Sequence, residues 1–232
     1  MKKVLLVLAA MFVFGLGTVC SQNYDVVYSL KMNPDKIVKD ISSQSGVPKA
    51  LLSFLKDDIR KAKLLVSLKM TDDKSDMTFL KDRSKFEIRF MGMSMDAAKM
   101  FDNAGINRYC DYSKTLFYTK MNVDGQAYIV KDKTEPKSQY TPVNLYKKIL
   151  GHECKKMTDK KSGTTLWYAV DIPFKTKMYP GVPGLVLEMS EDSGSFLFTA
   201  TSVKSTNKDV SFPHNAKEVT RQEMQKMMKH KH

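Results

Sequence analysis

Short apolar runs separated by polar turns make up most of the chain from residue 64 onward. Their alternation of apolar and polar positions is typical of strands, and β-branched and aromatic residues are frequent in them. An earlier run, YDVVYSLKM at 24–32, has the same character. Strands are therefore predicted at 24–32, 64–70, 76–80, 85–91, 115–121, 126–132, 152–158, 164–172, 184–190 and 195–203.

The hydrophobic period changes to that of a helix after the first strand. Asn33 is suited to cap a helix and Pro34 to be its first residue. A break at 42–46 ends this helix, and Pro48 begins a second one. The apolar positions of the second helix form one stripe, at Leu51, Leu52, Leu55 and Ile59. The sequence thus predicts a helical insert at about 34–62.

The end of the chain is helical again. Thr220 and Glu223 have the spacing of a capping box, and Met224, Met227 and Met228 follow on one face. A C-terminal helix is predicted at about 221–230. We expect its methionines to dock on the sheet, while binding to a membrane surface is the alternative.

These elements predict a mainly β (α+β) fold. The expected architecture is a single curved antiparallel meander sheet or partly open barrel, with an N-terminal helical pair and a short C-terminal helix. The turn Asn122–Gly125 is typical of a hairpin between two of the strands. Because no internal repeat or low-complexity linker interrupts the chain, residues 22–232 are predicted to form one domain.

The first 21 residues have the layout of a secretory signal peptide. Lys2 and Lys3 precede an apolar run at 4–19, and small or polar residues follow. An uncleaved anchor and lipidation at Cys20 are the alternatives. We expect an exported protein, in the periplasm, at the outer membrane or secreted. It should be soluble after cleavage, since no later segment reaches membrane-spanning length.

Composition and charge narrow the class of partner. Hydrophobic residues make up 42% of the 232-residue chain, which excludes wholesale disorder. Without Lys2 and Lys3 the formal net charge falls from +13 to +11, so an anionic amphiphile or an envelope protein is the expected partner. The lysines are dispersed without a basic–aromatic motif, which argues against nucleic acid. A basic face that only aids solubility is the alternative, and the oligomeric state is not predicted.

Cysteine content agrees with export. After removal of the leader only Cys110 and Cys154 remain. Two cysteines in an oxidising compartment usually pair, so a disulfide between them is predicted. On the chain-entropy model such a bridge would contribute about 3–4 kcal/mol.

The segment YPGVPGLVLEM, Tyr179–Met189, sets two Pro-Gly pairs directly before an apolar strand. Each pair suits the central positions of a type II turn, so two tight bends that fix the strand register are predicted. In the strand, Leu185, Leu187 and Met189 should share one face, with Val186 and Glu188 on the other. An anion-binding nest formed by the turn amides is the alternative.

The hexapeptide in this segment resembles the signature of the GLPGLI family, exported proteins of bacteroidete bacteria. It consists of Gly181, Val182, Pro183, Gly184, Leu185 and Val186, with valine in place of the family's leucine and isoleucine. The segments GHECKKM at 151–157 and LWYAVDIPF at 166–174 are similar to two further motifs of that family. The resemblance does not account for the helical insert. It implies export and a β-rich body, with no established activity.

No catalytic signature is found, so the protein is not expected to be an enzyme. His152 and Glu153 begin like a zinc-protease motif, but Lys156 occupies the position of the second histidine. No cofactor is expected.

A methionine cluster offers a second hypothesis. Met91, Met93 and Met95 alternate in RFMGMSM, and in a strand they would share one face, opposite an apolar face formed by residues 86, 88 and 90. Thioethers suit Cu(I), and His230 and His232 could add imidazole ligands. The alternative is that the methionines fill gaps in the core.

Taken together, the sequence favours a non-catalytic exported cell-envelope protein with a binding or structural role. The expected site is a concave β face that holds an amphiphile or an envelope partner. A soft-metal (copper) binding protein is the alternative function.

Overall fold

Hydrogen-bonded strands account for most of the chain that the structure describes. The computed structural model describes residues 22–43, 52–53, 56–57, 59–60, 64–80, 87–90, 93–96, 107–123, 125–132, 138–191 and 194–229. The predicted signal peptide lies outside these residues. The elements are β1 (Asn23–Met32), α2 (Pro34–Ser43), β2 (Leu64–Met70), β3 (Lys74–Leu80), β4 (Glu87–Phe90), β5 (Met93–Asp96), β6 (Arg108–Asp111), β7 (Leu116–Val123), β8 (Gln126–Lys131), β9 (Tyr140–Ile149), β10 (His152–Asp159), β11 (Thr165–Pro173), β12 (Gly184–Ser190), β13 (Phe196–Thr206), β14 (Lys217–Val219) and α5 (Arg221–Lys229).

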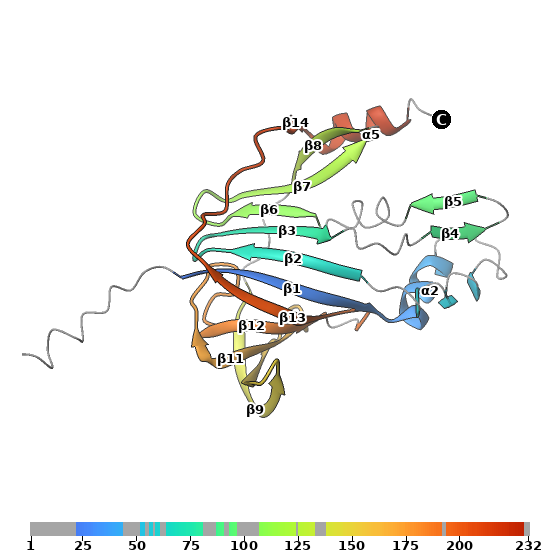
Figure 1. Ribbon diagram of the computed structural model, residues 1–232. Coiled ribbons are helices and arrows are strands. Elements are labelled where there is room, and N and C mark those ends of the chain that lie inside the picture. Colours follow the sequence, from blue (N-terminus) through green and yellow to red (C-terminus); the bar gives the residue numbers. More distant parts are fainter. Residues whose placement is uncertain are drawn as a thin grey trace, which may run out of the picture.

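Twelve strands form one open sheet, in the order β14-β8-β7-β6-β3-β2-β1-β13-β12-β11-β10-β9 (Figure 1). Adjacent strands run antiparallel, except that the short β14 lies parallel to β8. β4 and β5 form a separate two-stranded sheet. The prediction of a mainly β, antiparallel fold is confirmed, and β9 forms one edge of the large sheet.

The large sheet twists along its length. In the view of Figure 1, β9 runs across the direction of β1 and β2. Register shifts occur within the β1–β13, β9–β10 and β11–β12 pairs. Strands have an intrinsic right-handed twist, and bulges of this kind bend a strand and add to it.

The main core lies between β1, β2 and the strands β10 to β13. Alternate residues of β1 are buried, and Tyr28 donates a hydrogen bond of 2.6 Å from its hydroxyl to the carbonyl oxygen of Val186. This core is made by Tyr24, Val26, Tyr28, Leu30, Val66, Leu68, Met70, Ile149, Cys154, Ala169, Phe174, Leu185, Leu187, Phe198 and Ala200. Side chains therefore fill this part of the molecule.

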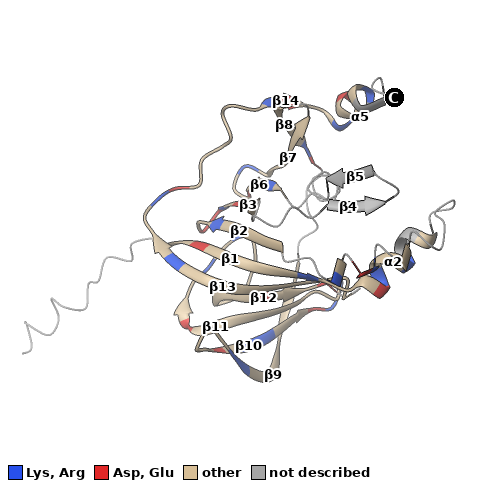
Figure 2. Cartoon of the chain, turned by 45° about the vertical axis from the view of Figure 1, so that its right-hand side comes forward, with Lys and Arg blue, Asp and Glu red and all other residues tan. Residues whose placement is uncertain are grey.

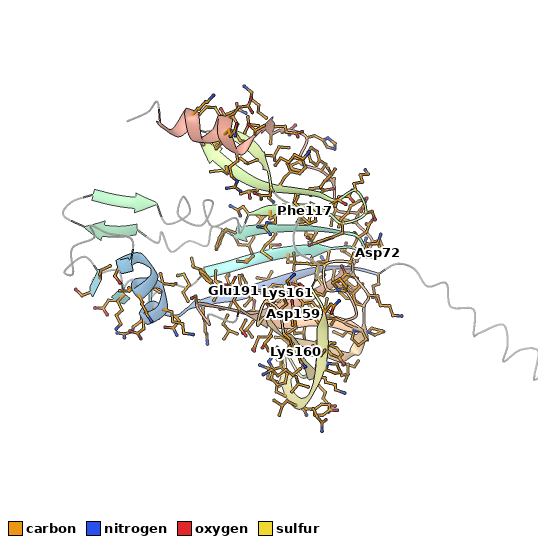
Figure 3. The ribbon with its side chains drawn as sticks, turned by 180° about the vertical axis from the view of Figure 1, so that it is seen from behind. Asp72, Phe117, Asp159, Lys160, Lys161 and Glu191 are labelled. Carbon is orange, nitrogen blue, oxygen red and sulfur yellow. The ribbon has the colours of Figure 1, made fainter. Side chains whose placement is uncertain are left out.

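The connection between β11 and β12 reaches across to distant turns of the sheet. The backbone N–H of Lys177 donates to the carbonyl of Asp72, at 2.6 Å, and its ammonium donates to the hydroxyl of Ser113, also at 2.6 Å. That hydroxyl in turn donates to the carboxylate of Asp73. Figure 3 labels Asp72 in the turn that joins β2 and β3. The connection thus fastens β11 and β12 to turns that are far from them in the sheet order.

Both described helices begin where the sequence predicts. The side chain of Asn33 accepts hydrogen bonds from the N–H groups of Asp35 and Lys36, so Asn33 caps α2. The predicted second helix falls largely outside the described residues, although residues 52–53, 56–57 and 59–60 are helical. None of the described helices combines the length and the apolar character needed to cross a membrane.

The C-terminal helix α5 confirms its capping box in both directions. The Glu223 N–H donates to the Thr220 hydroxyl, at 3.2 Å, and the Thr220 N–H donates to the Glu223 carboxylate, at 2.7 Å. Met224 is buried against Val130 and Val219, and Met227 packs beside them. Met224 and Met227 therefore dock on the sheet, as expected, while the side chain of Met228 lies outside the described part of the helix.

Four of the described strands were not predicted. The sequence patterns did not reveal β5, β6, β9 or β14. The single strand expected at 85–91 is instead β4, which pairs with β5 as a hairpin.

Candidate interaction surface

The hairpin β9–β10 ends in a two-residue turn with an unusual sequence. Ile149 pairs with His152, and the two residues between them, Leu150 and Gly151, have φ angles of 53° and 85°. Positive φ at both central positions is the geometry of a type I′ turn, in which Asn, Asp or Gly is favoured at the first position. A leucine there adopts a left-handed backbone that L-residues with bulky side chains rarely take. The chain thus holds a strained leucine at the tip of the hairpin.

Large exposed hydrophobic side chains gather around this hairpin. Leu145 is 50% exposed, Tyr146 53%, Leu150 47% and Val170 46%. Among the described residues, the only other large exposed hydrophobic side chain is Leu80 of β3. Single exposed apolar residues are ordinary, but a group of them at one edge marks an interaction site.

Lysines lie between these apolar side chains. Tyr146 pairs with Lys155 across the two strands, and Lys148 pairs with Glu153. Paired positions share a face, and these two pairs are two residues apart, so all four lie on the same face. The Lys155 ammonium lies 5.7 Å from the centre of the Tyr146 ring. We call Leu145, Tyr146, Lys148, Leu150, Lys155 and Val170 the edge surface.

The wider region around the edge surface is basic. Residues 140–177 contain eight lysines and three acidic residues. Figure 2 shows lysine-bearing stretches in blue along β9 and β10, at the bottom of the view. Lys160 and Lys161, in the turn after β10, are exposed and are labelled in the lower half of Figure 3. An acidic or anionic partner matches this charge.

A polar cluster fixes β9 on the opposite face of the hairpin. The Lys147 ammonium lies 2.5 Å from a carboxylate oxygen of Glu188 on β12, and 4.3 Å from the centre of the Trp167 ring on β11. The Thr199 hydroxyl donates to the other carboxylate oxygen. Glu188 is largely buried, with 15% of its side chain exposed. A charge-assisted pair that is shielded from water holds its geometry better than an exposed one.

A second contact holds the end of β11 beside the tip. The Nδ1 atom of His152 lies 2.8 Å from a carboxylate oxygen of Asp171, next to Val170. This hydrogen bond lowers the pKa of the Asp171 carboxyl below its usual value. Val170 and Leu150 are thus kept at the same end of the hairpin.

The edge strand carries features that oppose pairing with another strand. Pro142 lies within β9 and has no N–H to donate, and the register of β9 against β10 shifts next to Val143. Proline, bulges and lysines are devices that natural sheets use at their edges to prevent further pairing. The edge surface therefore presents side chains, rather than an open backbone ladder.

The predicted disulfide is not formed in this structure. Cys110 on β6 and Cys154 on β10 are both buried free thiols. Burial raises the pKa of each thiol above its usual value. In the sheet order, β3, β2, β1, β13, β12 and β11 lie between these two strands.

The hexapeptide motif contains one turn, where two were predicted. The Val182 N–H donates to the Tyr179 carbonyl at 3.1 Å, and Gly181 has a φ of 82°, so Pro180-Gly181 forms the predicted type II turn. Gly184 instead begins β12 with ordinary backbone geometry. A Cβ atom there would lie 2.1 Å from the carbonyl oxygen of Ala169. Its glycine serves the close approach of β11 and β12, and the second predicted turn is wrong.

Both faces of the strand after the motif are buried. Leu185 and Leu187 belong to the main core, whereas Val186 packs with Val182 and Tyr179 in a second cluster. The predicted division between faces is confirmed for Leu185, Val186 and Leu187, whereas Met189 packs against both clusters, after a register shift between β11 and β12. The Val182 amide is used within its own turn, which removes one donor from the anion-binding alternative.

The copper hypothesis is only partly covered by the described residues. Met91, His230 and His232 lie outside them. The register pairs Met93 with Phe90 and Met95 with Ile88, so these positions share a face of the small hairpin. The expectation that they lie opposite residues 88 and 90 is wrong, because the chain reverses between β4 and β5. Copper binding stays a prediction.

Within the described residues, no three His, Cys, Asp or Glu side chains are placed to hold a metal ion together. The described chain is a mainly β protein on one open, mostly antiparallel sheet, with an apolar and basic surface at its β9 edge.

Comparison with known proteins adds little to this description. No protein-family model matches the chain, and no curated protein matches it. Two solved structures of PNGF-II, in space groups C2 and P21, are similar at 16% identity, with TM-scores of 0.47 and 0.46. The likeness covers 89% of this chain and 32% and 33% of those chains, so this chain spans about a third of their length. The GLPGLI-like resemblance stays a prediction.

Proposed function

We propose that this chain is a non-catalytic, exported cell-envelope protein that binds an envelope component through the edge surface. The observation that carries the proposal is the grouping of Leu145, Tyr146, Leu150 and Val170 at one sheet edge, beside Lys148 and Lys155. Each apolar side chain is about half exposed. Complete burial of one such side chain would contribute about 1.5–3 kcal/mol, and part of this stabilisation is missing while the side chain stays in water.

We place the binding surface at the edge because the described interior is occupied. In this proposal the sheet is a strongly bent, partly open barrel. Phe174, Tyr179 and Val182 of the β11–β12 connection are buried against its strands. A ligand held inside would have to displace these side chains, whereas one at the edge displaces only water.

Export is the second part of the proposal. It is supported by the basic and apolar sequence of the first 21 residues. A basic protein in the envelope meets anionic lipids and acidic polymers, which is the partner chemistry that the edge surface suits.

The test is fractionation of cells that express the whole reading frame. We expect wild-type protein in the envelope pellet, from which high salt releases it. A combined Tyr146→Ser, Lys148→Glu, Lys155→Glu variant should move to the soluble exported fraction. A matched control, Lys204→Glu with Lys208→Glu, changes two exposed lysines at and just after β13 and should stay in the pellet. Recovery of the wild type in the cytosol, or equal retention of the edge variant, would contradict the proposal.

A further inference from the structure

We infer that the envelope component bound by the edge surface is an anionic lipid bilayer, on which the β9–β10 hairpin docks with its tip. The inference rests on the proposed function and names the partner of that same site. Two independent features of the hairpin support it, the leucine in its turn and the order of its side chains.

The first feature is the exposed leucine at a position where turn chemistry disfavours it. Leu150 adopts a φ of 53° and is 47% exposed, so neither backbone preference nor core packing explains its identity. Asn or Gly would form the same type I′ turn without strain. An apolar side chain kept at a strained, protruding position is suited to enter an apolar phase. The acyl region of a bilayer is such a phase, and it requires no matching pocket.

The second feature is the alternation of aromatic, aliphatic and basic residues along the hairpin. Tyr146 and Leu150 lie on either side of Lys148, and Lys155 is paired with Tyr146. The core of a protein–protein interface is depleted of charge, with polar residues confined to its rim. At a lipid surface, however, tyrosine rings lie at the level of the headgroups and lysines contact the phosphates. The interleaved order therefore favours lipid over an acidic protein.

The geometry of β9 also disfavours a partner that adds a strand. Pro142 lacks an N–H, and the register of β9 shifts close by. A strand that extends the sheet would need a continuous ladder of donors and acceptors along β9. The lysines on the exposed face would repel a second copy of the same edge.

Contacts with neighbouring strands fix the conformation of the hairpin before it binds. Lys147 is anchored to Glu188 and Trp167, and His152 to Asp171. These contacts tie β9 and β10 to β11 and β12, so docking need not order the hairpin first. A preformed surface loses less conformational entropy on binding than a flexible loop does.

The experiment is co-sedimentation with vesicles. The full reading frame is expressed, and mass spectrometry of each purified variant confirms that all compared proteins carry the same N-terminus. Vesicles of phosphatidylcholine alone are compared with vesicles that also contain phosphatidylglycerol. We expect wild-type protein to prefer the anionic vesicles. Raising the salt should weaken this binding, because charges further apart than about 8 Å are screened at 0.15 M.

Variants locate the binding on the hairpin. Lys148→Glu with Lys155→Glu should reduce affinity for the anionic vesicles at least about tenfold. Tyr146→Ser should reduce it about fivefold. The controls are Leu80→Ser, which removes the exposed leucine of β3, and the Lys204→Glu, Lys208→Glu pair. Both controls should bind as the wild type does.

Equal binding to both kinds of vesicle, or unchanged binding by the edge variants, overturns the inference. Its failure differs from failure of the proposed function. One outcome separates the two: the protein does not bind vesicles, yet the envelope pellet still retains it through the edge surface. If protease treatment of the pellet then abolishes this retention, the partner is a protein. The bilayer is then excluded while the proposed function stands. Loss of both kinds of binding overturns both.

Discussion

Replacing Leu150 by asparagine should stabilise the fold and weaken binding at the same time. In the structure Leu150 has a φ of 53°, in the left-handed region. That backbone costs about 1 kcal/mol for a residue with a bulky side chain, and asparagine relieves most of it. We therefore expect the free energy of unfolding to rise by about 0.5–1 kcal/mol. For a chain of this size Tm should rise by about 1–4 °C.

The effect on binding has the opposite sign. Complete burial of a leucine contributes about 1.5–3 kcal/mol, and 47% of Leu150 is still exposed. Burial of that exposed part in lipid is worth about 1 kcal/mol, so Leu150→Asn should lower affinity for anionic vesicles about fivefold. Thermal unfolding followed by circular dichroism gives the first quantity, and co-sedimentation gives the second.

Two further variants separate strain from contact. Leu150→Gly should gain a similar relief of strain and lose the same contact, whereas Leu150→Ala should lose the contact with little gain in stability. If Leu150→Asn is less stable than wild type, the turn is not strained as described. If it is more stable but binds as well as wild type, the leucine does not enter the bilayer.

Three other outcomes are expected. Gly184→Ala should destabilise the protein by about 3 kcal/mol in chemical denaturation, because the new Cβ would overlap the Ala169 carbonyl. Gly181→Ala has no atom within 4 Å of its new Cβ and should cost only about 1 kcal/mol, for its φ of 82°. Equal losses of stability would argue against close strand contact at position 184. Without reductant, Cys110 and Cys154 should resist alkylation in the native protein and react after unfolding, as assigned by mass spectrometry of the peptides; failure to react after unfolding would show a disulfide. Hydrogen bonds from the Thr220 N–H and hydroxyl lower the pKa of Glu223, so the contribution of Glu223 to α5 is complete above the ordinary glutamate pKa and is lost as the pH falls from there through the lowered pKa. Protection of the α5 amides against hydrogen exchange should decrease over that pH range, and Glu223→Gln should lose this pH dependence.

Local signals predicted those parts of the fold that local interactions determine. Asn33 caps α2 through its own side chain, and Thr220 and Glu223 satisfy each other's backbone donors at the start of α5. The hairpin at Asn122–Gly125 likewise depends on residues within the turn, since the Asn122 side chain accepts from the Gly125 N–H. In each case the interacting groups lie within a few residues of one another.

Properties set by distant contacts could not be predicted in this way. The sequence contains Pro-Gly twice, at 180–181 and 183–184, yet one pair forms a turn and the other begins a strand. The difference comes from Ala169, whose carbonyl approaches Gly184 from the neighbouring strand. The predicted disulfide failed for a related reason. Counting cysteines does not show that Cys110 and Cys154 fall on strands with six others between them.

The strand that carries the candidate surface, β9, was not predicted from the sequence, because edge strands do not follow the pattern of buried ones. β9 reads YTPVNLYKKI, in which Pro142 and the adjacent Lys147 and Lys148 interrupt the alternation that identifies buried strands. Pro142 and Lys148 are nevertheless typical of an edge strand, where proline lacks only a donor that nothing needs and an exposed lysine faces water. A search that treats proline and paired lysines as evidence for an edge would have recovered β9. It would also have singled out Leu150-Gly151, a turn whose first residue departs from local preference, and such departures tend to occur where function requires them.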